Sequence, residues 1–284
     1  MQTILRGTGK EVVIGIDKPF VIIGERINPT GHKKLAAALS EGNFDYVREL
    51  VRTQVADGAD ALDVNVGVPG LDDVALLPQV VELVAAETDV PICIDTPNPK
   101  ALAAALKVAP GKPLVNSVNG EKASLESVLP LVKERGAAVI GLTMDESGIP
   151  NDPQARLAIA ERILNHALQL GIPAEDVVID PLVLTVGADS NAGKVTLETI
   201  RLVREKLGVN INLGASNVSF GMPDRHTINQ AFLALAMGAG ATCAITHPGK
   251  LAPIIRAADL LLGRDEYGMR YISYWRTHQP KETA

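Results

Sequence analysis

Residues 58–65, Gly-Ala-Asp-Ala-Leu-Asp-Val-Asn, contain the pattern that decides the fold. A Gly-Ala pair is followed by a short apolar run, and the run ends on short polar side chains. The same pair comes before apolar runs at 136–137 and 240–241. Glycine after a helix favours the left-handed conformation that ends the helix and returns the chain to a sheet. The pattern therefore predicts strands that alternate with helices.

Eight strand–helix units can be read along the chain. The strands are expected at 20–24, 61–65, 91–95, 113–116, 138–142, 177–180, 210–213 and 242–246. The helices are expected at 43–56, 71–86, 98–107, 123–134, 153–170, 195–207, 226–237 and 251–262. The first of these carries Phe44, Val47, Leu50 and Val51 on one face, as an amphipathic helix does.

The strands read as nearly continuous apolar runs, which is typical of a parallel sheet covered on both faces. Eight right-handed units of this kind can close into a (β/α)8 TIM barrel, and this α/β fold is our prediction. A doubly wound open sheet is the alternative. It usually begins with a Gly-x-Gly-x-x-Gly turn, and the sequence contains none.

The chain of 284 residues is acidic and rich in hydrophobic residues. Hydrophobic residues make up 46%, which excludes a mainly disordered chain. The net charge is −6 and aromatic residues make up 3%, so nucleic acid is not expected as a partner. Cys93 and Cys243 lie in apolar contexts and predict reduced thiols in a cytoplasmic protein. No signal peptide or membrane-spanning run is recognised, so no membrane association is expected.

We predict one domain over residues 1–284, with an extension at each end. Residues 1–18 are expected to form a hairpin with a Gly-Thr-Gly turn over the N-terminal mouth of the barrel. Residues 264–284 form a C-terminal extension. Its aromatic side chains are expected to pack in the core or in an interface: Tyr267, Tyr271, Tyr274 and Trp275. Residues 26–42 are expected to form a loop.

Short polar side chains end most of the predicted strands. A TIM barrel carries its site at the carboxyl ends of its strands, and side chains at positions i and i+2 of a strand point the same way. The residues expected to meet in this mouth and to contact the ligand are Glu25, Asn28, Asp63, Asp95, Asn116, Asp180 and Asn217.

Such a ring of carboxylates and carboxamides suits a flat heterocycle with adjacent N–H groups and a carbonyl. Carboxylates accept paired N–H bonds, and carboxamides both donate and accept. An aminopyrimidinone, the head of a pterin, has these groups. A divalent metal held by Asp63, Asp95 and Asp180 is the alternative. The chain lacks the closely spaced carboxylates or histidine pairs of a strong metal site, so no metal is predicted.

Six segments together resemble the pterin-binding methyltransferase family. They are VIIGERINPTG (21–31), LDVNVG (62–67), PICIDT (91–96), LVNSVNGE (114–121), VIDPL (178–182) and LGASNVSFG (213–221). The family comprises methyltetrahydrofolate:corrinoid protein methyltransferases and the folate module of cobalamin-dependent methionine synthase. The resemblance runs from about residue 20 to residue 262. It implies a TIM barrel, commonly a homodimer, that moves the N5-methyl group between tetrahydrofolate and the cobalt of a corrinoid on a partner protein.

The resemblance also implies roles for individual residues. Asp95, Asn116 and Asp180 correspond to ligands of the pterin ring, and Asn217 to the asparagine that reaches N5. Asp95 is further expected to belong to the network that delivers a proton to N5.

Two residues of the loop after the seventh predicted strand, Ser219 and Arg225, are expected by the same resemblance to complete the site or to meet the folate tail. Phe220 stands where one branch of the family has glutamine, which leaves the identity of the corrinoid partner open.

Two other functions remain as alternatives. Dihydropteroate synthase uses the same barrel on a pterin diphosphate, and it would need basic groups late in the barrel. Only Lys250 follows the eighth predicted strand closely. The other alternative is a folate-binding module without catalysis.

Overall fold

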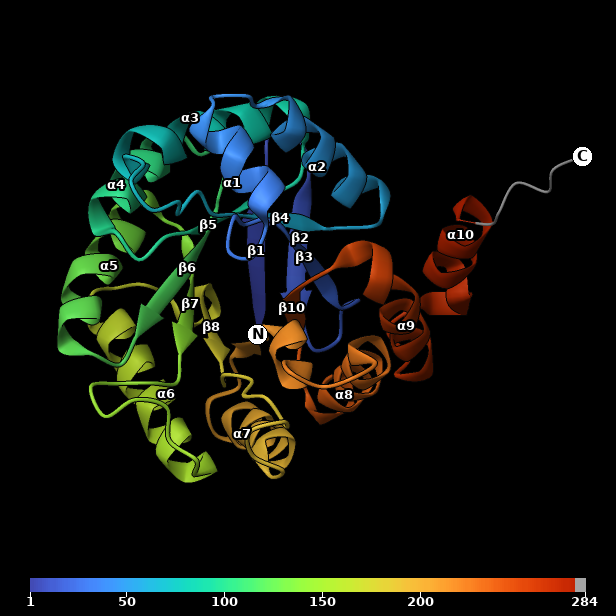
Figure 1. Cartoon of the computed structure of the whole chain (residues 1–284). Coiled ribbons are helices and arrows are strands. Elements are labelled where there is room, and N and C mark those ends of the chain that lie inside the picture. The colour runs from blue at the N-terminus through green and yellow to red at the C-terminus, as the bar shows by residue number, and fades with distance from the viewer. Residues whose placement is uncertain (279–284) are drawn as a thin grey trace, which may run out of the picture.

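The computed structural model describes residues 1–278 and contains a TIM barrel, as predicted (Figure 1). Eight parallel strands form one sheet in the order β10-β3-β4-β5-β6-β7-β8-β9. The bridge between Gly214 and Ile245 and the hydrogen bond from Thr242 N to Ile211 O join the two ends of this series. The strands are β3 (Val21–Ile27), β4 (Ala61–Val64), β5 (Ile92–Asp95), β6 (Leu114–Asn119), β7 (Ala138–Leu142), β8 (Val177–Asp180), β9 (Asn210–Ile211) and β10 (Cys243–Thr246).

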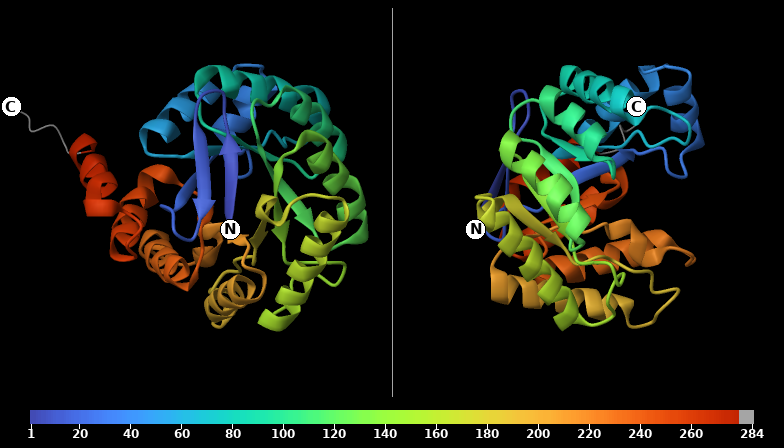
Figure 2. Two further views of the ribbon diagram at one scale, coloured as in Figure 1. Left: turned by 180° about the vertical axis from the view of Figure 1, so that it is seen from behind. Right: turned by 90° about the vertical axis from the view of Figure 1, so that its left-hand side faces the viewer.

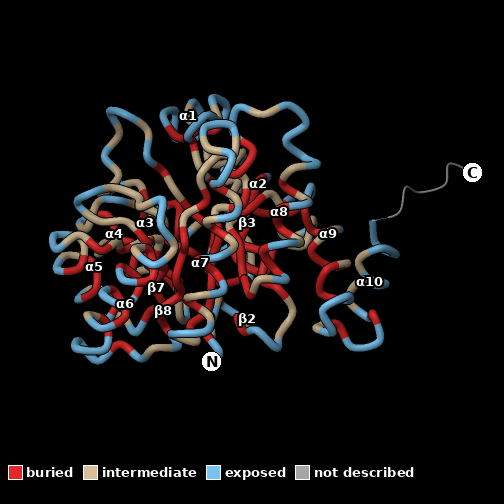
Figure 3. The backbone as a smooth tube through the Cα atoms, turned by 90° about the horizontal axis from the view of Figure 1, so that it is seen from below, coloured by how far each residue is buried: buried red, intermediate tan, exposed pale blue. Residues whose placement is uncertain are grey.

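The helices surround the strands, and their apolar faces cover the sheet (Figures 1 and 3). They are α1 (Lys33–Ser40), α2 (Asp45–Ala56), α3 (Asp73–Glu87), α4 (Pro99–Val108), α5 (Lys122–Arg135), α6 (Pro153–Gln169), α7 (Ala192–Leu207), α8 (Arg225–Ala239), α9 (Pro248–Leu261) and α10 (Met269–Thr277). Three short 3-10 helices are η1 (Ala174–Asp176), η2 (Ala215–Ser219) and η3 (Glu266–Gly268). Within residues 1–278, none of the helices combines the length and apolar character needed to cross a membrane.

Side-chain caps and glycines set the ends of these helices. The carboxylate of Asp72 accepts backbone N–H groups at the start of α3, and Asp152 does the same for α6. Gly136 and Gly240 have φ values of 67° and 118° at the ends of α5 and α8. Both glycines belong to the Gly-Ala pairs, so the sequence signal and its conformational cause agree.

Several local predictions were wrong. β3 and β6 continue past the expected strand ends at residues 24 and 116, to Ile27 and Asn119. β9 ends at Ile211, whereas the strand was expected to reach residue 213, because the chain turns into η2 soon afterwards. The segment 26–42, predicted as a loop, contains α1, whose Leu35 and Leu39 are buried. The C-terminal extension contains the unpredicted helix α10, which projects from the side of the barrel (Figure 1).

The predicted hairpin exists and closes the N-terminal end of the barrel. β1 (Gln2–Arg6) pairs antiparallel with β2 (Glu11–Gly15), and the pair lies across the barrel at the end opposite the helix-starting loops (Figure 2). Leu5, Val12 and Ile14 are buried among side chains that point into the barrel. The amide of Asn210 donates to Thr3 Oγ1 and to Ile14 O, both at 2.9 Å. The hairpin therefore forms an apolar plug under the barrel.

The aromatic residues of the C-terminal extension divide into two groups. Tyr274 packs against the main core, as predicted. Tyr267 and Trp275 are 87% and 57% exposed, so core packing was wrong for them. An interface role for these two remains a prediction. Residues 279–284 of the predicted extension lie outside the described residues.

Leu5→Ala is expected to lower the free energy of unfolding by about 2–4 kcal/mol, because Leu5 is fully buried under the barrel. Urea denaturation monitored by circular dichroism measures this change. Leu168→Ala is the control, since Leu168 is 47% exposed on α6 and should cost far less. Equal losses of unfolding free energy in the two variants would contradict the packing of the hairpin under the barrel.

Candidate functional site

The alternation of side chains along the strands builds the site. In β4, Ala61 points into the barrel above the hairpin, and Asp63 lies two residues nearer the carboxyl end on the same side. Cys93 and Asp95 repeat this arrangement in β5. Apolar side chains thus fill the lower barrel, and polar side chains line its upper end.

Three carboxylates are each held by a carboxamide. Asp63 Oδ1 accepts from Asn116 Nδ2 at 3.2 Å, and Asp95 Oδ2 accepts from Asn65 Nδ2 at 2.9 Å. Asp180 accepts from Asn212 Nδ2 and from the backbone N–H of Leu182, both at 2.8 Å. These bonds fix the orientation of the carboxylates and leave further oxygen lone pairs for a ligand.

Burial changes the proton affinity of these acids. Burial, followed by the charge of Asp95, raises the pKa of Asp63 well above its usual range. Burial also raises the pKa of Asp95, and it raises the pKa of Asp180 to about 6. The pKa of Glu25 is raised for the same reason. Carboxyl groups withdrawn from water in this way gain from a ligand that donates N–H bonds to them.

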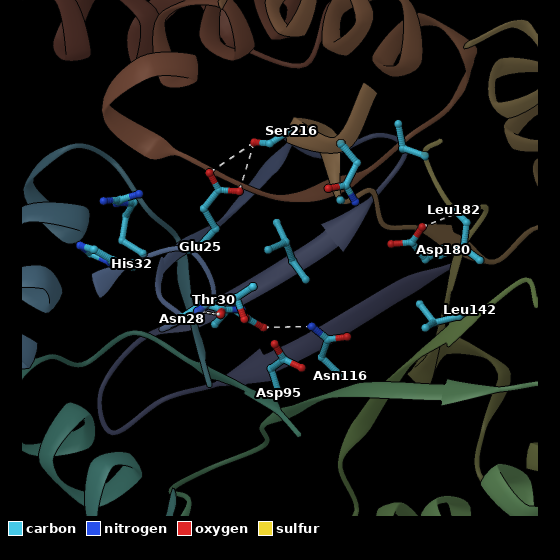
Figure 4. A pocket seen from close by; sticks show the side chains of 17 residues that line it. Glu25, Asn28, Thr30, His32, Asp95, Asn116, Leu142, Asp180, Leu182 and Ser216 are labelled. Carbon is cyan, nitrogen blue, oxygen red and sulfur yellow. Dashed lines mark hydrogen bonds between the residues drawn. The ribbon is translucent and has the colours of Figure 1, made fainter. Parts of the chain in front are cut away.

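These groups open into one cavity of about 500 Å³ at the carboxyl ends of the strands (Figure 4). Seven of the predicted site residues line it, namely Glu25, Asn28, Asp63, Asp95, Asn116, Asp180 and Asn217. Other lining residues were not predicted, among them Thr30, His32, Leu142 and Val183. The volume suits a bicyclic heterocycle.

The strand that carries Glu25 depends on a glycine. A Cβ atom at Gly24 would lie 2.5 Å from Gln54 Oε1. That oxygen accepts the backbone N–H of Arg26 at 2.8 Å, and Gln54 is almost fully buried. Glycine therefore permits the approach of α2 that fixes the Glu25–Arg26 turn at the mouth.

The loop after β9 places Asn217 at the rim of the cavity. Asn217 is exposed, and no hydrogen bond to its side chain is found in the described part of the chain. The neighbouring Ser216 Oγ donates to Glu25 at 3.2 and 3.3 Å. The Asn217 amide is thus free to turn toward a ligand as donor or acceptor.

Ser219 and Arg225 do not line this cavity. Ser219 is fully buried, and its Oγ accepts from Arg225 Nε at 3.1 Å. Arg225 Nη2 also donates to Ser216 O at 2.7 Å. The two residues therefore hold the 216–219 turn from behind, and Arg225 faces a second, smaller cavity.

Two carboxamides were missing from the predicted site. Asn212 is fully buried and donates to Asp180, and Asn65 donates to Asp95. Strand alternation indicates that both point inward, because Asn65 lies two residues after Asp63 and Asn212 two residues after Asn210, each just past the end of its strand. The Oδ1 atom of Asn212 also faces Cys243 Sγ at 3.6 Å, a contact that links two distant segments.

The grouping of the acidic side chains bears on the metal alternative. Within residues 1–278, no three His, Cys, Asp or Glu side chains are grouped so as to hold a metal ion. Asp63, Asp95 and Asp180 instead have carboxamide partners. His247, which follows β10, lines the smaller cavity rather than the main one.

Comparison with known proteins agrees with this geometry. Residues 24–247 match the family model described as pterin binding enzyme. The chain is 29% identical over 267 residues to the methylcorrinoid:tetrahydrofolate methyltransferase of Eubacterium limosum, with 90% of this chain and 96% of that protein covered. It is 32% identical over 253 residues to methionine synthase of Mycobacterium tuberculosis, with 84% of this chain but only 21% of that protein covered.

Solved structures show the same fold at lower identity. Dihydropteroate synthase of Yersinia pestis in complex with a sulfonamide drug superimposes with a TM-score of 0.71 at 13% identity. This covers 91% of this chain and 99% of that chain. At this identity the likeness establishes the barrel and nothing about the substrate. The matched family model covers most of the chain, including every strand end that lines the cavity, and the chain therefore belongs to the family of pterin binding enzymes.

Proposed function

We propose that this enzyme is a methyltransferase that moves the N5-methyl group between methyltetrahydrofolate and a corrinoid carried by a partner protein. The observation that carries the proposal is the cavity itself. Three carboxylates, each held by a carboxamide, lie below the free amide of Asn217 at the open rim, and Asp63 and Asp180 are buried while Asp95 is half-buried. The printed name of the relative from Eubacterium limosum, which matches over most of both chains, supports this chemistry.

The carboxylates suit the pyrimidine end of the pterin. That end offers a ring N–H and an exocyclic amino group side by side, and a buried carboxylate accepts such a pair. Asp180 is the candidate for this contact because its orientation is fixed by two donors. Asp63, Asp95 and Asn116 would hold the remaining polar edge of the ring, with Glu25 and Asn28 nearer the mouth.

Asn217 is the candidate for the group that faces N5. A tertiary amine that loses its methyl group to a nucleophile leaves badly as an anion, whereas protonated N5 leaves as a neutral amine. A carboxamide can accept a hydrogen bond from N5–H⁺ and can donate to unprotonated N5 after rotation. Because the Asn217 amide has no other partner among the described residues, it can follow both charge states. Its effect is electrostatic stabilisation of the transition state.

The proton itself needs an acid or a water chain beside N5. The raised pKa of Asp95 keeps part of this group protonated at higher pH than a solvent-exposed aspartate, and this supports its place in the delivery network. The corrinoid on the partner would accept or supply the methyl group at its cobalt. The same residues serve transfer in either direction.

The open rim of the cavity leaves room for a corrinoid on a partner protein to reach the methyl group. Phe220 is 69% exposed directly after η2, next to the turn that carries Asn217. We also propose a homodimer that works in the cytoplasm. The apolar side chains exposed near the C-terminus, Leu261 and Trp275 among them, support a subunit interface, and the two buried free thiols support a reducing compartment.

Asn217→Ala is expected to slow methyl transfer to a free Co(I) corrinoid by about 10² to 10³, the usual cost of losing one preorganised polar group in a transition state. Methyltetrahydrofolate should still bind within a few-fold. Stopped-flow absorbance of the Co(I) corrinoid gives the rate, and calorimetry gives the affinity. Asn191→Ala is the control, because this exposed asparagine precedes α7 and does not line the cavity.

A normal rate in Asn217→Ala would refute the role of this residue. Binding of methyltetrahydrofolate without transfer by the unmodified enzyme would instead indicate a folate-binding module. Turnover of a pterin diphosphate with p-aminobenzoate would indicate a dihydropteroate synthase.

The affinity for tetrahydrofolate is expected to fall about tenfold as the pH drops from 7.5 to 5. Asp180 has a pKa of about 6, and only its ionised form accepts both pterin N–H groups, so protonation below that pH opposes binding. Asp180→Asn should bind more weakly at pH 7.5 and should lose Asp180's part of the pH dependence. Calorimetry across this range checks both, and an unchanged pH profile in the variant would contradict the assignment.

A further inference from the structure

A second cavity of about 240 Å³ lies beside the main one. Glu25, Arg26 and Ser216 line both cavities. One elongated molecule can therefore occupy the two together. Since Ser216 precedes Asn217 in the same turn, the second cavity lies on the side of the site assigned to N5.

The second cavity is lined by three cations and one carboxylate, Glu25, whose pKa burial raises and the charges of the three cations lower. Arg26, Arg225 and Lys250 face it, and none of them takes part in an ion pair in the described part of the chain. The chain as a whole carries a net charge of −6, so the positive charge around this cavity is opposite in sign to the charge of the protein. This charge also acts on His247: burial lowers the pKa of His247, and the charges of Arg26 and Lys250 lower it further. Three cations against one carboxylate leave a net positive charge around the cavity, and such a charge favours an anionic ligand.

A buried carboxamide adds a second requirement. Asn229 on α8 lines the same cavity and is only 9% exposed, yet its Oδ1 has no hydrogen-bond partner. A buried acceptor of this kind is costly unless a ligand donates to it. His247 Nδ1 is also buried without a partner. The cavity thus offers positive charge for an anion and a carbonyl oxygen for an N–H donor.

We propose that this second cavity binds the glutamyl end of the folate molecule, with its carboxylates on Arg26 and Lys250 and its amide N–H on Asn229. The inference rests on the proposed function, since it extends the ligand whose pterin occupies the main cavity. The connection is chemically consistent because the aminobenzoylglutamate chain leaves the pterin at C6, the atom bonded to N5.

Asn229 distinguishes this ligand from a phosphate. The diphosphate of a pterin diphosphate would satisfy the cations but has no N–H group for Asn229 Oδ1. A corrinoid carries amide N–H groups beside its phosphate, so it is the affinity for ligands with and without the glutamate that separates it from the glutamyl end. A glutamyl amide supplies both a carboxylate and an N–H group in one residue. The combination of cations with the Asn229 Oδ1 acceptor therefore favours the glutamyl end.

The experiment compares two ligands that differ only in the glutamate, 5-methyltetrahydrofolate and 5-methyltetrahydropteroate. The unmodified enzyme is expected to bind the first about tenfold more tightly, as a charge-assisted contact would require. Lys250→Gln and Asn229→Leu should each weaken 5-methyltetrahydrofolate several-fold and leave 5-methyltetrahydropteroate within twofold. Calorimetry measures both ligands. Lys107→Gln is the control, because this exposed lysine lies in the last turn of α4, at the other end of the barrel.

Lys250 is exposed, so Lys250→Gln keeps the test valid if Asn229→Leu fails to fold. Equal affinity of the unmodified enzyme for the two ligands would overturn the inference while leaving the proposed function intact. So would slower transfer to a protein-bound corrinoid with unchanged folate affinity, which would assign the cations to the partner. Failure of both ligands to bind would refute the pterin site itself.

Discussion

The whole structure depends on the burial of carboxylates at the upper end of a closed sheet. Side chains that alternate along each strand must point either to the helices or into the barrel, and there is no third direction. Apolar side chains take the inward positions near the hairpin, and Asp63, Asp95 and Asp180 take those near the mouth. The acids lose water there, which raises their pKa and makes them strong acceptors for a donor-rich ligand.

The carboxamides make the buried carboxylates specific for one kind of ligand. Without Asn65, Asn116 and Asn212, the carboxylates would lose the donors that fix their orientation. With them, one face of each carboxylate is occupied and the remaining lone pairs have fixed directions. A flat ring with donors in matching positions is satisfied, and a ligand with acceptors there is repelled. The polar partners therefore matter to recognition as much as the acids do.

The barrel and most of its mouth could be predicted because their signals are local. Apolar runs, glycines after helices and polar strand ends each lie within a few residues of the feature that they indicate. α1 was missed because its short run of lysines and alanines has no capping residue, and its order comes from packing Leu35 and Leu39. The role of Asn212 was missed because alternation gives the direction of its side chain but not its partner, Asp180, which lies on another strand about thirty residues earlier.

The group of cations could not be predicted for a similar reason. Arg26 comes from the first barrel strand and Lys250 follows the last, and only the pairing of β10 with β3 makes them neighbours. In the sequence, Lys250 had no basic neighbour that would mark an anion site. The resemblance assigned Ser219 and Arg225 either to the site or to the folate tail. They hold the turn beneath Asn217 and do not line the main cavity, whereas Arg225 lines the second one.

The hairpin under the barrel has a consequence for how the acids exchange protons with the surroundings. Leu5, Val12 and Ile14 fill the lower end, and the cavity that holds the carboxylates opens at the opposite end. A heterocycle that fills the mouth then separates the carboxyl groups beneath it from bulk solvent until it leaves. The protons that the acids hold when the heterocycle enters are therefore the ones available while it is bound, and solvent replaces them only after it leaves.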